Sequence, residues 1–522
     1  MRQAAAWEDA GQAEARAEAP GPVGAKPAVR ARARFKRVER GQTVFRTVVI
    51  DELIEADHAA RAIWEFTGHL DLSAYSAPVK AIEGVAGREP WNVRLLMSLW
   101  IYAYSRGIGS ARELSRRCGC DPAFQWLTGM EKVNYHTLAD FRVAHGEALG
   151  ELFAQVLGVL SVDGLVTLER VAHDGTKIQA SAGGDSFRRE GTLQKHLDAA
   201  REQVAAMGDP LADATARQCA ARERALRERP ARLERALEEL KAIRETKRGA
   251  AEQAEARASE TDPEARMMKM GNGGYAPAYN AQITTDAAHK IVVGVGLSAS
   301  ASDYGELAGS IQRVEEAMGR KPGQAVVDGG FTSRENIVAM DEAGVDLIGS
   351  LDEHNEQSAG QMRRRGVDEA FYPKAFQYDA QADQYRCPAG KLLRHDGQEK
   401  HPGVIQHQYR ARRADCQACE WKERCCPGNG TKGRSIRRAE ESPSVRAFVE
   451  KMQTVAAKAI YRLRGAVAEF PNAWIKAKLG LRQFHVRGKD KALSECLWAC
   501  ITYNIQQWIR LRWRARADAV AG

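Results

Sequence analysis

The chain has 522 residues, and its 77 lysines and arginines against 68 aspartates and glutamates leave a net charge of +9. A hydrophobic fraction of 44% and a charged fraction of 28% exclude a membrane protein and a wholly disordered chain. No apolar run approaches the ~18 residues of a membrane span, and the acidic, alanine-rich N-terminus lacks the apolar stretch of a signal peptide. We therefore expect a cytoplasmic protein of about two to four domains.

Positive charge is concentrated in two runs, KPAVRARARFKRVER at 26–40 and IRLRWRAR at 509–516. Both are candidates for contact with the phosphates of a nucleic acid. The first run equally fits a solvated tail, because residues 1–43 show no apolar periodicity. We predict that 1–43 is a disordered basic tail.

Residues 44–150 predict a mostly helical domain, with the strongest helical pattern in WNVRLLMSLWIYAY at 91–104. Short helices joined by tight turns follow, and Thr137 is placed as a helix N-cap. This arrangement fits a helix-turn-helix that reads DNA, but it also fits a plain helical bundle.

Residues 151–183 and 267–354 predict an α/β core, because strand patterns alternate there with helical ones. One strand delivers Asp174 at or near its end, and another, QAVVDGGF, ends at Asp328. Between the two parts, 184–266 is rich in Arg, Ala and Glu and carries leucines at helical spacing, which predicts an inserted helical hairpin. Because Pro230 interrupts its second arm, a partly disordered charged linker stays open as an alternative.

The last two segments differ in character. Residues 355–440 read as irregular and bear five of the ten cysteines, and 441–522 are helical and complete the core. In the last helix, Cys496 and Cys500 fall on one apolar stripe, so we expect them to be core residues.

Three acids stand out by position: Asp174 and Asp328 at strand ends, and Glu469 in a helical segment. Carboxylates at adjacent strand ends, joined by one from a packed helix, can hold two hard divalent cations for phosphoryl transfer. Glycines follow both aspartates and leave space beside them.

Several phrases in order along the chain, HDGTKIQASAG, TDPEARMMK, GGYAPAYNAQITTD, VVDGGFTSRENI and YRLRGAVAEF…WIKAKLGLRQFHVRG, resemble the DDE transposases of bacterial insertion sequences. The resemblance covers about 44–508. It implies an RNase H-like mixed-sheet core, an N-terminal helical domain that binds DNA, and Asp174, Asp328 and Glu469 as catalytic ligands of two Mg²⁺ ions.

The helix of Glu469 also resembles the family's Tyr-Arg-Glu-Lys signature, which implies DNA-contacting roles for Tyr461, Arg464 and Lys476. Four residues separate Arg464 from Glu469 where many relatives have three. Pro471 predicts a kink or a helix start just after the glutamate. Downstream, the basic stretch GLRQFHVRGKDK, in which Phe484 is interleaved, predicts a groove for the DNA backbone; its basic members are Arg482, His485, Arg487 and Lys489.

The cysteine cluster is a second chemical signal. Cys387 precedes a CxxC pair, Cys416 and Cys419, and Cys425 and Cys426 follow, which suits a tetrahedral zinc site. We take Cys387, Cys416, Cys419 and Cys425 as the zinc ligands, with Cys426 as the alternate fourth. A redox CxxC is disfavoured because no thioredoxin-like frame surrounds it, and unmetallated core thiols stay open as an alternative.

The sequence thus predicts a transposase that cleaves the ends of an insertion sequence and joins them to target DNA. The resemblance further implies terminal inverted repeats and target DNA as partners, a homodimer on DNA and a place at the bacterial nucleoid. The competing hypotheses are a DNA-binding protein of transposase origin that lacks strand transfer, and a cellular nuclease of the same fold.

Overall fold

The computed structural model describes residues 41, 43, 45, 47–77, 89–206, 216–247, 249–351, 359–428 and 432–516. The basic run 26–40 lies outside the described residues, as does nearly all of the predicted tail 1–43. Among the described helices, none combines the length and the apolar character that a membrane crossing needs.

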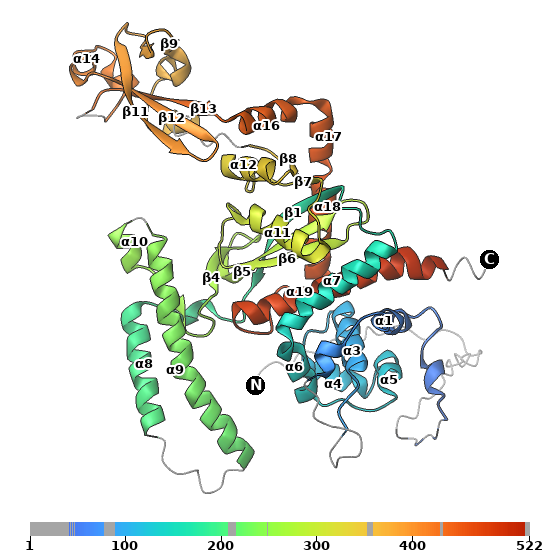
Figure 1. Cartoon of the computed structure of the whole chain (residues 1–522). Helices are drawn as coiled ribbons and strands as arrows, with labels where there is room; N and C mark the ends of the chain where they lie inside the picture. Colours follow the sequence, from blue (N-terminus) through green and yellow to red (C-terminus); the bar gives the residue numbers. More distant parts are fainter. Residues whose placement is uncertain are drawn as a thin grey trace, which may run out of the picture. The chain divides into compact units, whose positions relative to one another are not determined.

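Helices make up the N-terminal part, as Figure 1 shows. They are η1 (Ile50–Leu53), α1 (Ala59–Thr67), α2 (Ser73–Ser76), α3 (Val93–Ser105), α4 (Ala111–Cys118), α5 (Pro122–Thr128), α6 (Tyr135–Ala144) and α7 (Gly146–Val162). Helix α3 is buried along most of its length, and the indole of Trp100 donates to the carbonyl of Leu138 at 3.0 Å. Helix α7 continues across the predicted boundary at residue 150.

The predicted cap of α6 is wrong. Asn134 precedes the helix, and its Oδ1 accepts a hydrogen bond from the backbone N–H of His136 at 2.9 Å. Asparagine is as good an N-cap as threonine, so the earlier of the two residues starts the helix and Thr137 lies inside it.

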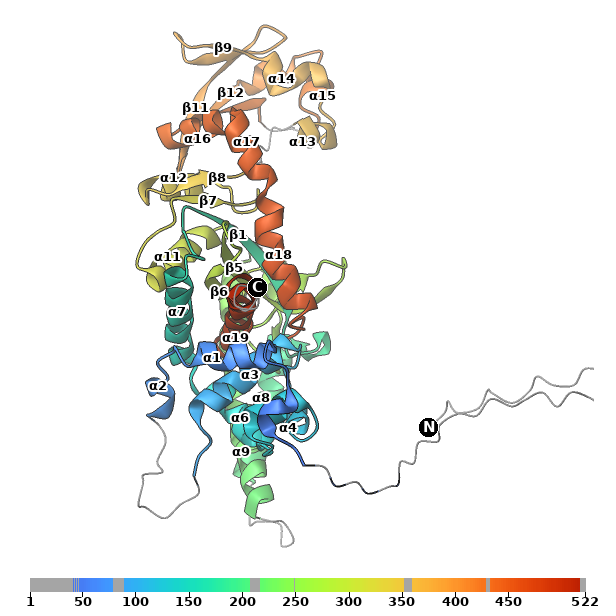
Figure 2. The same ribbon diagram turned by 90° about the vertical axis from the view of Figure 1, so that its right-hand side faces the viewer.

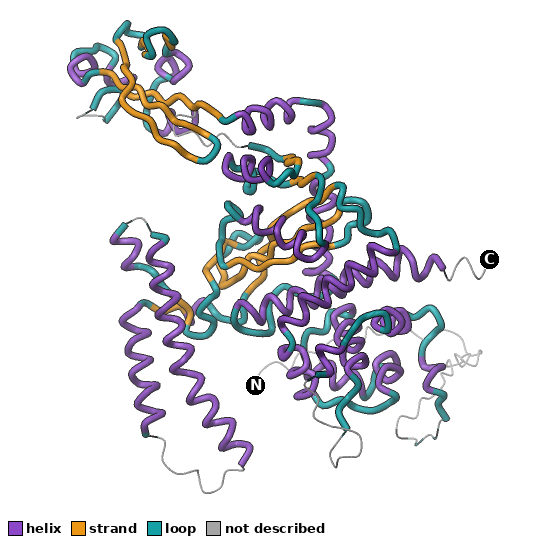
Figure 3. Tube along the Cα trace, in the orientation of Figure 1, coloured by secondary structure: helices purple, strands orange, loops and turns teal. Residues whose placement is uncertain are grey.

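A mixed six-stranded sheet follows, drawn in orange in Figure 3. Its strands are β1 (Arg170–Gln179), β4 (Arg266–Lys269), β5 (Tyr275–Asp286), β6 (Val292–Ser298), β7 (Gln324–Val326) and β8 (Asp346–Ile348). The order is β4-β5-β1-β7-β8, with β6 also on β5. Strand β1 pairs antiparallel with β5 and parallel with β7, and β7 pairs parallel with β8.

Helices cover both faces of this sheet. Helix α11 (Glu306–Met318) packs directly on β6, where a Cβ added to Gly294 would meet Val314 at 2.8 Å. Helix α18 (Arg464–Ala477) contacts β1 and β5, as Figure 2 shows. Around them lie α12 (Arg334–Glu342), α16 (Pro443–Gln453), α17 (Val455–Arg462), α19 (Lys489–Trp508) and η5 (Ile509–Trp513).

The segment predicted as a helical hairpin contains two long helices, α8 (Glu190–Ala205) and α9 (Ala216–Glu245), which contact each other. A small separate core between them is built from Leu193, Leu197, Ala200, Leu233, Ala236 and Leu240. Pro230 lies inside α9 and does not end it. The short elements at their base are η2 (Gly184–Ser186), β2 (Phe187–Arg188), α10 (Ala250–Ala254) and β3 (Ala258–Ser259).

The expectation that residues 355–440 are irregular is wrong, because they contain a five-stranded antiparallel sheet in the order β13-β12-β11-β10-β9. The elements are α13 (Ala359–Arg364), η3 (Glu369–Phe371), η4 (Pro373–Ala375), β9 (Gln377–Asp379), β10 (Gln384–Arg386), β11 (Leu392–His401), β12 (Val404–Ala411), α14 (Arg413–Gln417), α15 (Lys422–Cys425) and β13 (Ser435–Glu441). Strand β11 has eight consecutive exposed residues after Leu393, so it lacks the apolar alternation that reveals a strand in sequence.

One continuous hydrophobic core joins the N-terminal helices, the six-stranded sheet and α19. Cys496 and Cys500 are fully buried in it, which confirms them as core residues. The chain is thus a mixed α/β protein with a helical N-terminal region and a mixed central sheet.

Candidate active site

Asp174 and Asp328 lie side by side because of the pairing of two strands. Strands β1 and β7 are parallel, and Ala172 is opposite Val326. Asp174 follows Ala172 by two residues, and Asp328 follows Val326 by two residues. The parallel register therefore brings the two aspartates next to each other. Asp174 lies in the middle of β1 and not at its end as predicted, because β1 continues against β5 beyond the end of the three-residue β7.

Helix α18 covers Asp174 on one face of the sheet. The amide Nδ2 of Asn472 donates to Asp174 Oδ2 at 3.1 Å. Asn472 is buried, and its Oδ1 has no hydrogen-bond partner among the described residues. Pro471 lies inside this helix, so the predicted helix start at the proline is wrong.

The charges around Asp174 oppose its ionisation. Burial, and next the negative charge of Asp328, raise the pKa of Asp174 to about 6, while Arg464 and the Asn472 hydrogen bond act in the opposite direction. Burial lowers the pKa of Lys476, which is opposed by the nearby Asp174. The site therefore holds more negative charge than its own cations neutralise, and it would favour a bound cation.

Glu469 lies on the same helix but is turned toward solvent. Its side chain is 65% exposed, and its carboxylate is 3.8 Å from the guanidinium of Arg464, which is 19% exposed. The charge of Arg464 thus acts both on Glu469 and on Asp174.

The opposite face of β1 carries polar residues that the sequence reading missed. His173 is buried, bonded to Thr284 and Gln282 at 2.9 Å each, and burial lowers its pKa to about 4, so it is neutral. Asp303 accepts hydrogen bonds from Asn280 at 2.7 Å and Gln282 at 3.2 Å.

On this second face of β1, the close approach of Asp303 leaves no room for a side chain at Gly175. A Cβ added to Gly175 would approach Asp303 Oδ1 to 2.4 Å. The glycine after Asp174 therefore makes room for Asp303, whereas we expected it to leave space for a metal or a phosphate. Asp303 was not identified as a site residue from the sequence, which predicts a helix over 303–318; the helix begins only at Glu306, and Asp303 lies in the loop before it.

The predicted DNA-contacting residues differ in their exposure to solvent. Arg482 and Arg487 are exposed, and their Nε atoms donate to the backbone carbonyls of Lys476 at 3.3 Å and Ser181 at 3.2 Å. Lys476 is near Asp174. Tyr461 is partly buried and packs against the small core around Val326.

Other residues of the basic stretch make contacts within the protein. Phe484 is 2% exposed and contacts Tyr279 edge-on, so it is not an exposed ring interleaved with basic residues. His485 Nδ1 is 2.7 Å from the buried carboxylate of Glu495, which Arg142 also approaches to 3.6 Å. The backbone N–H of Lys489 donates to Glu264 at 2.9 Å.

The C-terminal basic run is also engaged within the chain. Arg510 donates to Gln507 at 2.7 Å, Arg512 donates to the carbonyl of Asp163, and Arg516 is 3.5 Å from the carboxylate of Asp163. These contacts connect the end of α19 to the end of α7. Their positive charge is thus partly satisfied internally, contrary to the expectation of free phosphate contacts.

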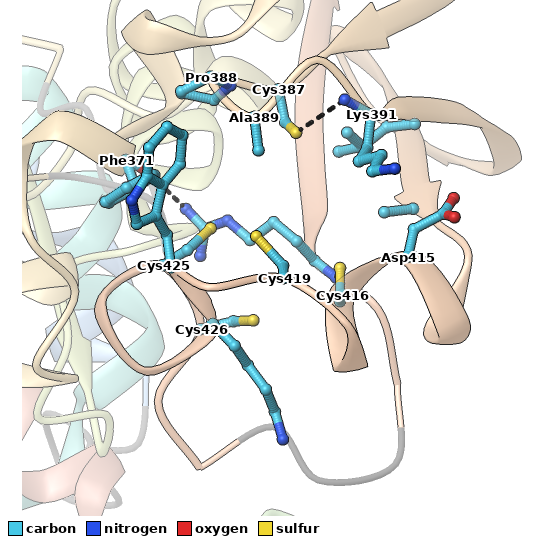
Figure 4. Close-up of a pocket in the computed structure, with 15 residues that line it drawn as sticks. Phe371, Cys387, Pro388, Ala389, Lys391, Asp415, Cys416, Cys419, Cys425 and Cys426 are labelled. Carbon is cyan, nitrogen blue, oxygen red and sulfur yellow. Dashed lines mark hydrogen bonds between the residues drawn. The ribbon is translucent and has the colours of Figure 1, made fainter.

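The cysteines predicted to bind zinc surround one small cavity of about 30 Å³ (Figure 4). Cys387, Cys416, Cys419, Cys425 and Cys426 all line it, together with Arg434 and Trp421. No disulfide joins these five cysteines. In the described part of the chain, no group of three or more His, Cys, Asp or Glu side chains is already arranged to hold a metal ion, at this cavity or at the acids.

Comparison with known proteins matches two separate segments to transposase families. Residues 386–509 match the family described as "Transposase DDE domain", and residues 48–144 match the family described as "Transposase domain". The first segment includes Glu469 but neither Asp174 nor Asp328.

No curated protein matches the chain. Among solved structures, the cryo-EM structure of the piggyBac transposase synaptic complex with hairpin DNA is similar at 8% identity, over 90% of this chain and 83% of that chain. Its TM-score of 0.23 does not establish a shared fold. The two segment matches place the chain among the DDE transposases, enzymes that cleave and transfer DNA strands.

Proposed function

We propose that this transposase cleaves the ends of an insertion sequence and joins them to target DNA by phosphoryl transfer, with Asp174, Asp328 and Glu469 as its catalytic acids. The observation that carries the proposal is the in-register pairing of β1 with β7, which puts two aspartates at one level beneath α18. The strand order β6-β5-β1-β7-β8, with the first three antiparallel and the last two parallel to β1, supports an RNase H-like core.

The residues fit a site for divalent metal ions such as Mg²⁺. Carboxylate and amide oxygens are the ligands that hard cations prefer. Asp174 and Asp328 repel each other, and the buried Asn472 Oδ1 beside them has no partner in the described chain. Asp174, Asp328, Glu469 and Asn472 would hold two ions. When bound, the ions supply an activated water and stabilise charge on the phosphoryl group.

The cationic residues of α18 have separate roles in this proposal. Lys476, half-buried near Asp174, would contact the phosphate next to the scissile bond. Arg464 would exchange its contact with Glu469 for a DNA phosphate, which frees the third acid for the metal site. Tyr461 positions α17 against the strand that leads to Asp328 and would contact DNA from there.

The helical N-terminal region, which matches a transposase family, would bind the terminal inverted repeats. Two copies would act on paired ends at the nucleoid, which only the family resemblance supports.

The test of this proposal is a reaction with duplex DNA that carries the sequences flanking the coding region. We expect strand cleavage at the element end and joining of the free 3′-hydroxyl to a target duplex, both dependent on Mg²⁺ and blocked by EDTA. Binding without cleavage would favour the DNA-binding protein, and cleavage without joining would favour the nuclease.

Binding to DNA should weaken steeply with salt, and Arg487→Ala should reduce the slope of log affinity against log salt by about one. Arg487 is exposed beside the end of β1, where its Nε donates to the carbonyl of Ser181 and its charge acts on the carboxylate of Asp262. Its exposure leaves the guanidinium accessible to a phosphate. The slope is measured by fluorescence anisotropy over a salt series.

The matched control is Lys321→Ala, which removes a cation that is 3.8 Å from Glu315 and far along the chain from α18. It should leave the slope unchanged. An equal effect of both substitutions would mean that Arg487 acts only through net charge.

A further inference from the structure

The cysteine module, residues 359–441, has little hydrophobic core of its own. Its sheet is built around Phe376, Leu393, Tyr409, Ala411 and Ile436, with Cys387, Cys416 and Cys425 packed against them. A second small group of Met362, Val367 and Phe371 lies against Trp421 and Cys425. Modules with so few buried apolar residues usually need a metal or disulfides for stability, and these thiols are unpaired.

Two of the thiols already receive backbone hydrogen bonds. The N–H of Lys391 points at Cys387 Sγ at 3.2 Å, across a tight turn in which Gly390 has a φ of +77°. The N–H of Arg434 points at Cys416 Sγ at 3.4 Å. A backbone N–H directed at sulfur stabilises the thiolate, which is the form that binds metals.

A buried cation, Arg434, lies among the thiols, and no ion pair joins it to an acidic side chain of the described residues. Arg434 is 8% exposed, and its guanidinium donates to the carbonyl of Phe371 at 3.0 Å, while its Nε has no partner among the described residues. The ionisable groups of opposite sign that act on it most strongly are Cys425, Cys426 and Cys416, which line the same cavity. A buried charge without a counter-charge is costly, and thiolates formed on metal binding would supply one.

We propose that Cys387, Cys416, Cys419 and Cys425 bind one Zn²⁺ ion as thiolates and that Arg434 is the buried counter-cation of this centre. On binding, the four thiols release four protons to solvent, and Zn²⁺ with four thiolates carries a charge of −2, which Arg434 partly neutralises. The cavity has room for a single ion. The thiols are not yet at ligand distance, so the ion draws them inward to sulfur–metal distances of ~2.3 Å.

The first test measures zinc in the full-length protein purified without chelators. We expect about one zinc per chain, and none in the Cys416→Ser, Cys419→Ser double variant. Cys120→Ser is the control, because that thiol is exposed and lies outside the module, and it should leave the zinc content unchanged. Removal of the zinc should make 359–441 sensitive to protease, while the central sheet stays protected.

Cobalt substitution of the unaltered chain guards against a variant that fails to fold. Bound Co²⁺ should show the intense visible bands and the sulfur-to-metal charge transfer of a tetrahedral thiolate site. Arg434→Met should weaken zinc binding about tenfold in competition with a chelating dye, and Arg434→Lys should restore most of it.

Three results would overturn the proposal: no zinc or cobalt bound by the folded chain, zinc unaffected by the double cysteine variant, or a Cys416–Cys419 disulfide found by mass spectrometry in freshly purified protein. None of these measurements involves DNA, so the outcome is independent of the proposed transposition chemistry.

Discussion

Asp174→Asn is expected to abolish strand cleavage, by at least ~100-fold, and at the same time to stabilise the metal-free protein. The asparagine keeps the shape and can still accept the hydrogen bond from Asn472, but it removes a metal ligand. In the native chain the pKa of Asp174 rises from 3.8 to about 6 through burial and the charge of Asp328. Such a carboxyl lowers the free energy of unfolding by about 3 kcal/mol once it is ionised.

The sign of this effect sets the pH window. The folded state holds the proton more tightly than the unfolded chain, so the stability associated with Asp174 is present below pH 3.8 and is lost as the pH rises to about 6. Urea unfolding in EDTA should therefore show the variant more stable than the native protein at about pH 8, with the difference shrinking toward about pH 4.

Asp198→Asn is the matched control, since Asp198 is exposed on α8 and bonded only to Gln194 in the described chain. It should change neither cleavage nor stability. A variant at Asp174 that still cleaves at more than about a hundredth of the native rate would remove that residue from the active site.

Glu469→Gln should lower strand cleavage as severely as Asp174→Asn, but it should leave stability almost unchanged. Its carboxylate is mostly exposed and makes a single ion pair at 3.8 Å, which is worth little to folding. The loss of activity would come from the missing third carboxylate, while binding to end DNA should persist. Cleavage and anisotropy assays on the same preparation separate the two effects.

For this variant the comparison is Glu450→Gln, an exposed glutamate on α16. It should retain native cleavage. Full activity in Glu469→Gln would show that the metal ions are held without the Glu469 carboxylate, for instance by Asp303 with the aspartate pair.

The aspartate pair could be predicted from the sequence because short-range patterns identify it. A strand pattern precedes each aspartate, but Asp174 lies within β1 and not at its end, so it is the register of β1 with β7 that brings the two to one level. Asn472 could not be predicted in this way, because its contact with Asp174 joins residues 298 positions apart. The sequence placed Asp303 at the start of a predicted helix, and only its hydrogen bonds with Asn280 and Gln282 of β5 show that it faces the site.

In the cysteine module, the sequence identified the candidate ligands but not the secondary structure. Its sheet was missed because β11 exposes polar residues on both faces, so backbone pairing and not apolar alternation defines that strand. The cysteines in the same segment were visible from spacing alone. The buried state of Arg434 was not, since an arginine in sequence is expected at the surface.

Pro471 makes α18 locally easier to bend. Proline has no N–H, so the carbonyl of Val467, four residues earlier, receives no helical hydrogen bond from it. The turn that carries Glu469 is therefore tied to the rest of the helix by one bond fewer than a regular turn. Rotating that turn toward Asp174 would disrupt less backbone bonding than the same movement elsewhere in α18, and this is the movement that the proposed metal-binding role of Glu469 requires while Asn472 keeps its bond to Asp174.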